Sequence, residues 1–93
     1  MYAERTDAAT PATTSSFNVA SLTDTGTGNT GYNLTASMDD DDAPVSGTNS
    51  STSGDFGVLS RYASTSQVQS ITRNSSGTDT DRRVSVIGLG DLA

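Results

Sequence analysis

The sequence predicts an all-β fold: an antiparallel β-sandwich or small barrel of about six short strands, with an extended N-terminal arm. Apolar residues alternate with polar ones in several short stretches. Segments rich in Gly, Asp, Asn and Ser separate these stretches, as turns do between strands. No window repeats apolar residues at the i, i+3, i+4 spacing of an amphipathic helix.

Residues 1–15 are polar throughout and show no hydrophobic period. We expect them to form an N-terminal arm or anchor, either a flexible leader or a segment that becomes ordered only against a neighbouring molecule, with Tyr2 as its natural contact. Residues 16–93 are then the β-sandwich domain.

The first expected strand covers residues 16–22, where Phe17 and Val19 alternate with polar neighbours and are expected on one face. The segment DTGTGNTG, residues 24–31, follows as a loop, because its three glycines tolerate positive φ.

A second strand is expected over residues 31–38, with Tyr32, Leu34 and Ala36 in phase. The acidic run DDDDAP, residues 39–44, is expected to be an exposed loop, because adjacent carboxylates repel one another and are costly to bury. A third, weak strand is expected over residues 43–48.

After a second long loop at residues 47–55, the segment FGVLSRYAS, residues 56–64, has the clearest strand pattern. Its alternation places Phe56, Val58, Ser60 and Tyr62 on one face and Leu59 and Arg61 on the other. Gly57 is interpreted as a bulge or a close backbone approach.

The segment SQVQSITR, residues 66–73, is the next expected strand. Val68 and Ile71 are out of phase in it, which indicates a bulge between them. A turn follows at residues 74–81. The closing strand lies within RRVSVIGLGDLA, with Val84 and Val86 on one face and Ile87 and Leu89 on the other.

Hydrophobic residues make up 31% of the 93 residues and aromatic residues 5%, so the expected core is small. Such a composition also fits a disordered chain, but the ordered alternation favours folding. Because the chain has no Cys, disulfides cannot compensate for the small core. We therefore expect an obligate homo-oligomer or a module docked on a larger assembly.

The net charge of −6 and the absence of Lys argue against binding to nucleic acid or anionic membranes. No apolar run approaches the length of a membrane-spanning helix, so no membrane insertion is expected. The first residues lack a signal-peptide core, and synthesis in a cytoplasm is expected.

The chain has no His, Cys or Lys, so we expect no enzyme, no catalytic residues, no cofactor and no metal site. The run Asp39–Asp42 is interpreted as a solvated loop, with cation binding as the alternative. Asp79 and Asp81 precede Arg82 and Arg83, and local surface ion pairs are expected there rather than a metal site.

The aromatic side chains are candidates either for the core or for contact with a partner. Tyr32, Phe56 and Tyr62 are favoured as core residues, with stacking on a sugar ring as the alternative. The candidates for partner or anchor contacts are Tyr2, Phe17, Tyr32, Phe56 and Tyr62.

Three segments carry a resemblance to a known family: SFNVASLTDTGTGNTGYNLTASM, FGVLSRYAS and VSVIGLGDLA. Over residues 16–93 the chain resembles the small C-terminal β-domains of tail fibres and related virion structural proteins of bacteriophages, cyanophages especially. The acidic run at Asp39–Asp42 with Pro44 departs from the family, as do Gly88 and Gly90 in the closing strand.

The resemblance implies a virion structural module, made in the host cytoplasm and displayed on the particle as a homotrimer. A fibre- or spike-type role in attachment to the host ranks first, with other virion proteins and a host surface glycan as expected partners. The alternatives are a capsid decoration (cement) protein that braces capsomers, and a carbohydrate-binding module.

Overall fold

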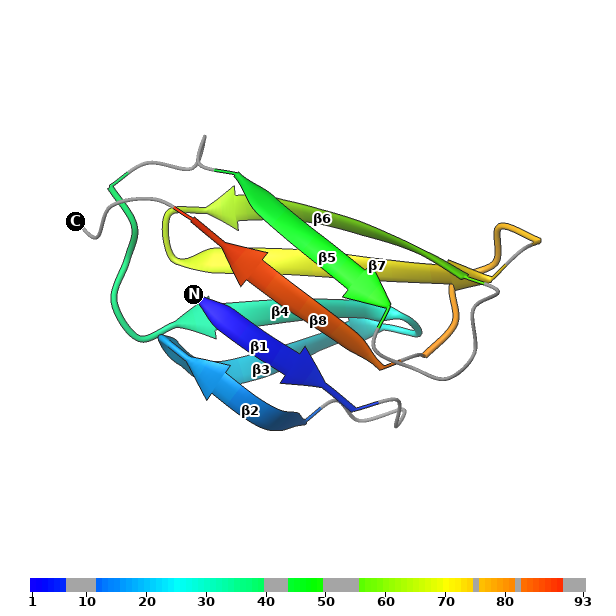
Figure 1. Ribbon diagram of the computed structural model, residues 1–93, viewed down its shortest axis with the longest axis horizontal. Helices are drawn as coiled ribbons and strands as arrows, with labels where there is room; N and C mark the ends of the chain where they lie inside the picture. Colours follow the sequence, from blue (N-terminus) through cyan, green and yellow to red (C-terminus); the bar gives the residue numbers. More distant parts are fainter. Residues whose placement is uncertain (7–11, 40–43, 50–55, 75, 82, 90–93) are drawn as a thin grey trace.

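The computed structural model describes residues 1–6, 12–39, 44–49, 56–74, 76–81 and 83–89. In these residues eight strands form two four-stranded antiparallel sheets that pack as a β-sandwich, and no helix is present (Figure 1). The strands are β1 (Tyr2–Arg5), β2 (Thr13–Phe17), β3 (Val19–Gly26), β4 (Asn29–Leu34), β5 (Val45–Asn49), β6 (Phe56–Ser64), β7 (Gln67–Asn74) and β8 (Val84–Gly88). The all-β prediction is confirmed, with two strands more than expected.

Sheet A has the strand order β2-β1-β8-β5, and sheet B has the order β3-β4-β7-β6. The expected N-terminal arm is not confirmed, because β1 lies inside sheet A between β2 and β8 (Figure 1). Residue 16, the expected domain boundary, falls within β2. The sandwich therefore includes the first residues of the chain, and β1 and β8 form the centre of sheet A.

A corner at Asn18 carries the chain from sheet A to sheet B. Its φ of 61° is a left-handed conformation that asparagine tolerates better than most residues. The Asn18 side chain fixes the corner, since Oδ1 accepts from the backbone N–H of Ala36 at 2.7 Å and Nδ2 donates to the Ala36 carbonyl at 3.1 Å. The expected strand over residues 16–22 is therefore divided, and the prediction that Phe17 and Val19 share a face is wrong.

The turn between β3 and β4 is shorter than the loop expected over residues 24–31. Only Thr27 and Gly28 lie between the two strands. Gly28 has φ of 71°, and a Cβ there would lie 2.7 Å from the Thr72 carbonyl oxygen. The sequence DTGTGNTG is thus mostly strand, with positive φ at Gly26, where β3 ends, and at Gly28 in the turn.

The core lies between the two sheets. Its buried apolar residues are Met1, Ala3, Tyr32, Leu34, Met38, Tyr62, Val68, Val84 and Val86. Buried threonine and serine lie beside them, which is how a chain with little hydrophobic material fills the sandwich.

The β6–β7 hairpin has the expected bounds within a few residues, and its faces are mostly those expected. Val68 is buried and Leu59 is exposed. The expected bulge between Val68 and Ile71 is wrong: the pairing is regular there, and the register shifts between Tyr62 and Ser64 instead. Ile71 simply lies on the outer face, directly opposite Leu59.

Glycine allows the two sheets to approach at β5 and β6. A Cβ on Gly47 would lie 2.6 Å from Val58 Cγ1 and would also overlap the Ser60 hydroxyl. Gly57, in contrast, has no atom near its would-be Cβ and no register shift, so the expected bulge or close approach there is wrong.

Candidate functional site

Three apolar side chains lie side by side across the outer face of sheet A. Tyr2 in β1 is paired with Phe17 in β2 and with Ile87 in β8. Their neighbours along β1 and β8, Ala3 and Val86, point into the core and are fully buried. The alternation of a strand therefore turns Tyr2, Phe17 and Ile87 outward, and we call these three residues the sheet A apolar row.

The sheet A apolar row is largely open to solvent. Phe17 is 71% exposed and Ile87 is 49% exposed. Leu89, two residues beyond Ile87, adds a further side chain that is 60% exposed. Large contiguous apolar surface is typical of an interaction site rather than of an isolated soluble domain.

The row brings together Tyr2 and Phe17, two of the five residues expected to contact a partner. Tyr32 and Tyr62 are buried in the core and are not available to stack on a sugar. Phe56 begins β6, and its side chain lies outside the described part of the structure.

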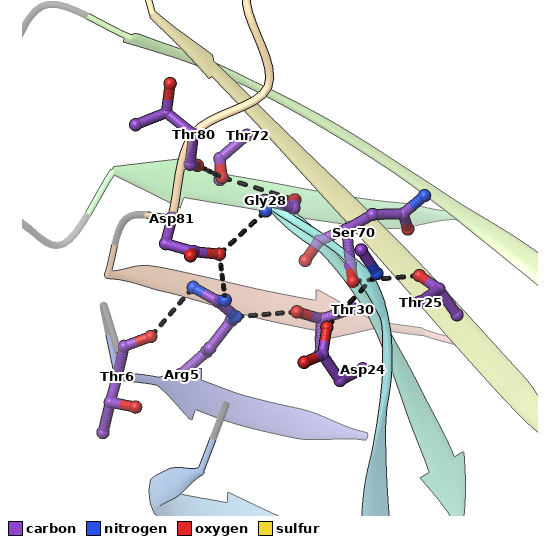
Figure 2. Close-up of polar contacts among 12 residues, drawn as sticks. Arg5, Thr6, Asp24, Thr25, Gly28, Thr30, Ser70, Thr72, Thr80 and Asp81 are labelled. Carbon is purple, nitrogen blue, oxygen red and sulfur yellow. Dashed lines mark hydrogen bonds and ion pairs between the residues drawn. The ribbon is translucent and has the colours of Figure 1, made fainter. Parts of the chain in front are cut away.

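Figure 2 shows a polar cluster around Arg5, the last residue of β1. Arg5 is 1% exposed, because its position in β1 alternates with Glu4 and so points inward. Its Nε donates to Thr30 Oγ1 at 2.7 Å, its Nη1 to the Thr6 carbonyl at 2.9 Å, and its Nη2 to Asp81 Oδ1 at 3.0 Å. Each guanidinium nitrogen thus has an acceptor.

The same Asp81 oxygen also accepts from the backbone N–H of Gly28 at 2.8 Å. Thr72 extends the cluster, since its backbone N–H donates to the Gly28 carbonyl at 2.8 Å and its hydroxyl donates to the Thr80 carbonyl (Figure 2). The cluster therefore ties β1, the β3–β4 turn and the segment before β8 together. Because the polar groups of the cluster bind one another, we infer that the cluster stabilises the fold.

Tyr32 lies close to this cluster, and its hydroxyl is 2.9 Å from Ser70 Oγ. Burial raises the pKa of Tyr32, while the Ser70 hydrogen bond and the Arg5 charge oppose the shift. The phenol is therefore a neutral core group at physiological pH.

A chain of hydrogen-bonded side chains crosses the outer face of sheet B. It consists of one guanidinium, three amides and two hydroxyls: Arg61, Gln69, Gln67, Asn33, Ser21 and Thr23. Arg61 Nε and Nη2 donate to Gln69 Oε1 at 3.1 and 2.9 Å, and Gln67 Nε2 donates to Asn33 Oδ1 at 2.9 Å. Because a guanidinium can only donate, the bond from Arg61 sets which amide atoms accept and which donate along the rest of the chain of side chains.

A shallow cavity of about 170 Å³ adjoins the Arg61 end of this chain. It is lined by Leu59, Ser60, Arg61, Gln69 and Ile71. We call it the sheet B cavity. Leu59 and Ile71 supply aliphatic lining, and Arg61, whose guanidinium is held by Gln69, lies beside them. The cavity therefore suits an aromatic group, which is apolar and also attracts a cation.

A second hollow of about 250 Å³ opens between the edge strands β2 and β3. Its lining consists of small and polar residues with Val19 and Leu22: Ala12, Thr13, Val19, Ala20, Ser21 and Leu22. Register shifts in β3 beside it disturb the strand edge, which is a usual protection against pairing with other chains.

Among the described residues, no group of three or more acidic side chains is placed to hold a metal ion. Asp39 is exposed, and the rest of the acidic run lies outside the described residues. Asp79 pairs with Arg73 at 2.9 Å and Asp81 with Arg5 at 3.0 Å, so both carboxylates have partners from other strands. Arg82, one of the two arginines expected to pair with them, lies outside the described residues. No helix in the described residues is long and apolar enough to cross a membrane.

The Arg5 cluster could not be predicted from the sequence, because the segment YAER shows no hydrophobic period. The sheet A apolar row was partly visible, since Ile87 and Leu89 are out of phase with Val84 and Val86. Comparisons of the chain with protein-family models, curated proteins and solved structures find no match.

Proposed function

We propose that this chain is a structural module of a bacteriophage virion, displayed on the particle surface and assembled with copies of itself. The observation that carries the proposal is the sheet A apolar row, which leaves Phe17 and Ile87 open to solvent in a chain with a small core. Contact with other copies would bury this surface and supply stability that the core of one chain lacks. The resemblance of residues 16–93 to fibre domains agrees with this role.

The expected assembly is a homotrimer attached to other virion proteins. Sedimentation velocity of the purified chain over a range of concentrations tests this part of the proposal. A species of three times the monomer mass is expected. A monomer at every concentration would contradict self-assembly.

Within this proposal a fibre- or spike-type module for host attachment ranks ahead of a capsid decoration protein. Gold-labelled antibody against the chain, imaged on purified phage particles, distinguishes the two. Label at the tail or spikes, together with blocked adsorption to host cells, supports attachment. Label over the capsid, together with particles that lose stability when the protein is removed, supports decoration. Particles without label would contradict both roles.

A further inference from the structure

The two outer faces of the sandwich carry complementary features. Sheet A presents Phe17 as its most exposed large apolar side chain, and sheet B presents the sheet B cavity. The two sheets pack through their inner faces, so these features lie on opposite sides of the molecule. One copy therefore cannot fill its own cavity with its own Phe17.

The size of the sheet B cavity fits an aromatic ring. An apolar cavity of about 150 Å³ is enough to accommodate benzene, and the sheet B cavity measures about 170 Å³. Leu59 and Ile71, directly opposite each other on β6 and β7, supply an aliphatic floor. Leu59 is 54% exposed, so an inserted ring would remove apolar surface of both copies from water.

The rim of the cavity also fits an aromatic ring. Two nitrogens of Arg61 bind Gln69 Oε1, which holds the guanidinium in one orientation. A guanidinium over the face of an aromatic ring is attracted by the ring electrons. Arg5 and Arg73 already have carboxylate partners, whereas the partner of Arg61 is a neutral amide.

We propose that Phe17 of one copy inserts into the sheet B cavity of a second copy, between Leu59, Ile71 and Arg61. This inference rests on the proposed function, whose self-assembly it assigns to a defined contact. The contact is heterologous, because each copy contributes a different surface. Such a contact closes into a ring when its rotation permits and otherwise continues as an open filament.

The charge of the chain predicts how salt affects the contact. Copies with a net charge of −6 repel one another, while the inserted group, Phe17, is uncharged. Screening by salt weakens this repulsion. Association is therefore expected to strengthen from low to moderate salt.

Mixing two variants tests the contact. Phe17→Ser removes the inserted group and keeps the cavity, whereas Leu59→Gln spoils the cavity and keeps Phe17. Both positions are exposed, so both variants are expected to fold, which circular dichroism checks. In sedimentation velocity each variant alone is expected to be monomeric. An equimolar mixture is expected to form dimers and nothing larger, because one intact contact remains.

Several outcomes would overturn the inference. If Leu59→Gln assembles like the unchanged chain, or if the mixture gives no dimers, the contact is not between Phe17 and the cavity. In that case the proposed function still holds if the unchanged chain assembles. If the unchanged chain is monomeric throughout, both the inference and the proposed self-assembly fail.

A matched pair of charge variants tests the role of Arg61. Arg61→Gln and Arg73→Gln change the net charge equally, and both side chains lie on sheet B. Arg61→Gln is expected to weaken association by about twofold to fivefold, as loss of an exposed cation–π contact does. Arg73→Gln is expected to leave association unchanged. Equal effects of the two variants would overturn the assignment of Arg61.

Discussion

At the scale of single residues, Arg5 shows how a charged side chain can hold a small core together. Its guanidinium is buried and bonded to Thr30, Thr6 and Asp81. Arg5→Met is expected to destabilise the fold by about 3 kcal/mol, because Asp81 and Thr30 would lose a buried partner. Urea unfolding followed by circular dichroism measures the change.

The control is Arg73→Met, which breaks the exposed pair with Asp79. An exposed pair contributes at most about 1 kcal/mol. Equal losses for the two variants would show that the Arg5 cluster is no more stabilising than a surface pair.

The raised pKa of Tyr32 predicts that the fold loses stability at alkaline pH. Its folded pKa is raised above the ordinary value of 10.0 by burial. The unfolded chain therefore releases the phenol proton first, and stability falls as pH rises from 10 through the raised folded pKa. Below pH 10 this contribution is fully present.

Urea unfolding at a series of pH values from 8 to 11 measures this slope. Tyr32→Phe is expected to be less stable at pH 8 by about 1–2 kcal/mol, because Ser70 loses its partner. The variant is also expected to show a shallower decline above pH 10. If the stability of Tyr32→Phe declines above pH 10 as steeply as that of the unchanged chain, titratable groups other than Tyr32 cause the alkaline loss.

At the scale of the strands, Gly47 in β5 and Gly57 in β6 have opposite roles. A Cβ on Gly47 meets Val58 at 2.6 Å, while a Cβ on Gly57 meets nothing. Gly47→Ala is expected to destabilise the fold by about 1–3 kcal/mol, because β5 and β6 must move apart. Gly57→Ala is expected to be neutral or stabilising by about 0.4–1 kcal/mol.

Thermal unfolding of the two alanine variants, side by side, checks this prediction. Each serves as the control for the other, since the substitution is identical. A stable Gly47→Ala variant would mean that β5 and β6 can separate without cost.

The strand pattern could be predicted where apolar residues alternate over a whole strand, as in β6. It failed where the backbone changes direction without a change in pattern, as at Asn18. The segment FNV alternates like a strand, yet the left-handed φ of Asn18 divides it between two sheets. It failed again at β1, since YAER becomes a strand only through pairing with β2 and β8.

At the scale of the whole molecule, self-assembly predicts that stability depends on concentration. A partner that binds only the folded chain raises Tm. A tenfold rise in concentration is expected to raise Tm by about 3–6 °C. Differential scanning calorimetry measures this shift.

The Phe17→Ser variant serves as the control, and its Tm is expected to be independent of concentration. If the Tm of the unchanged chain is also independent of concentration, a single copy is stable by itself.

The candidate site could be predicted only in part, because it depends on which strands become neighbours. Tyr2 and Phe17 were expected to contact a partner, but alternation alone could not place them beside Ile87, some 70 to 85 residues away in the chain. The partners Arg5 and Asp81 are separated by 76 residues. Short-range patterns carry no information about such pairings.

The position of β8 between β1 and β5 also has a consequence for how the chain is made. Translation produces β1 and β5 before β8, so sheet A lacks one of its two central strands until β8 has left the ribosome. Contacts between such distant segments slow folding. During that interval the edges of β1 and β5 that later pair with β8 are unpaired, and the nascent protein is then most vulnerable to aggregation and proteases.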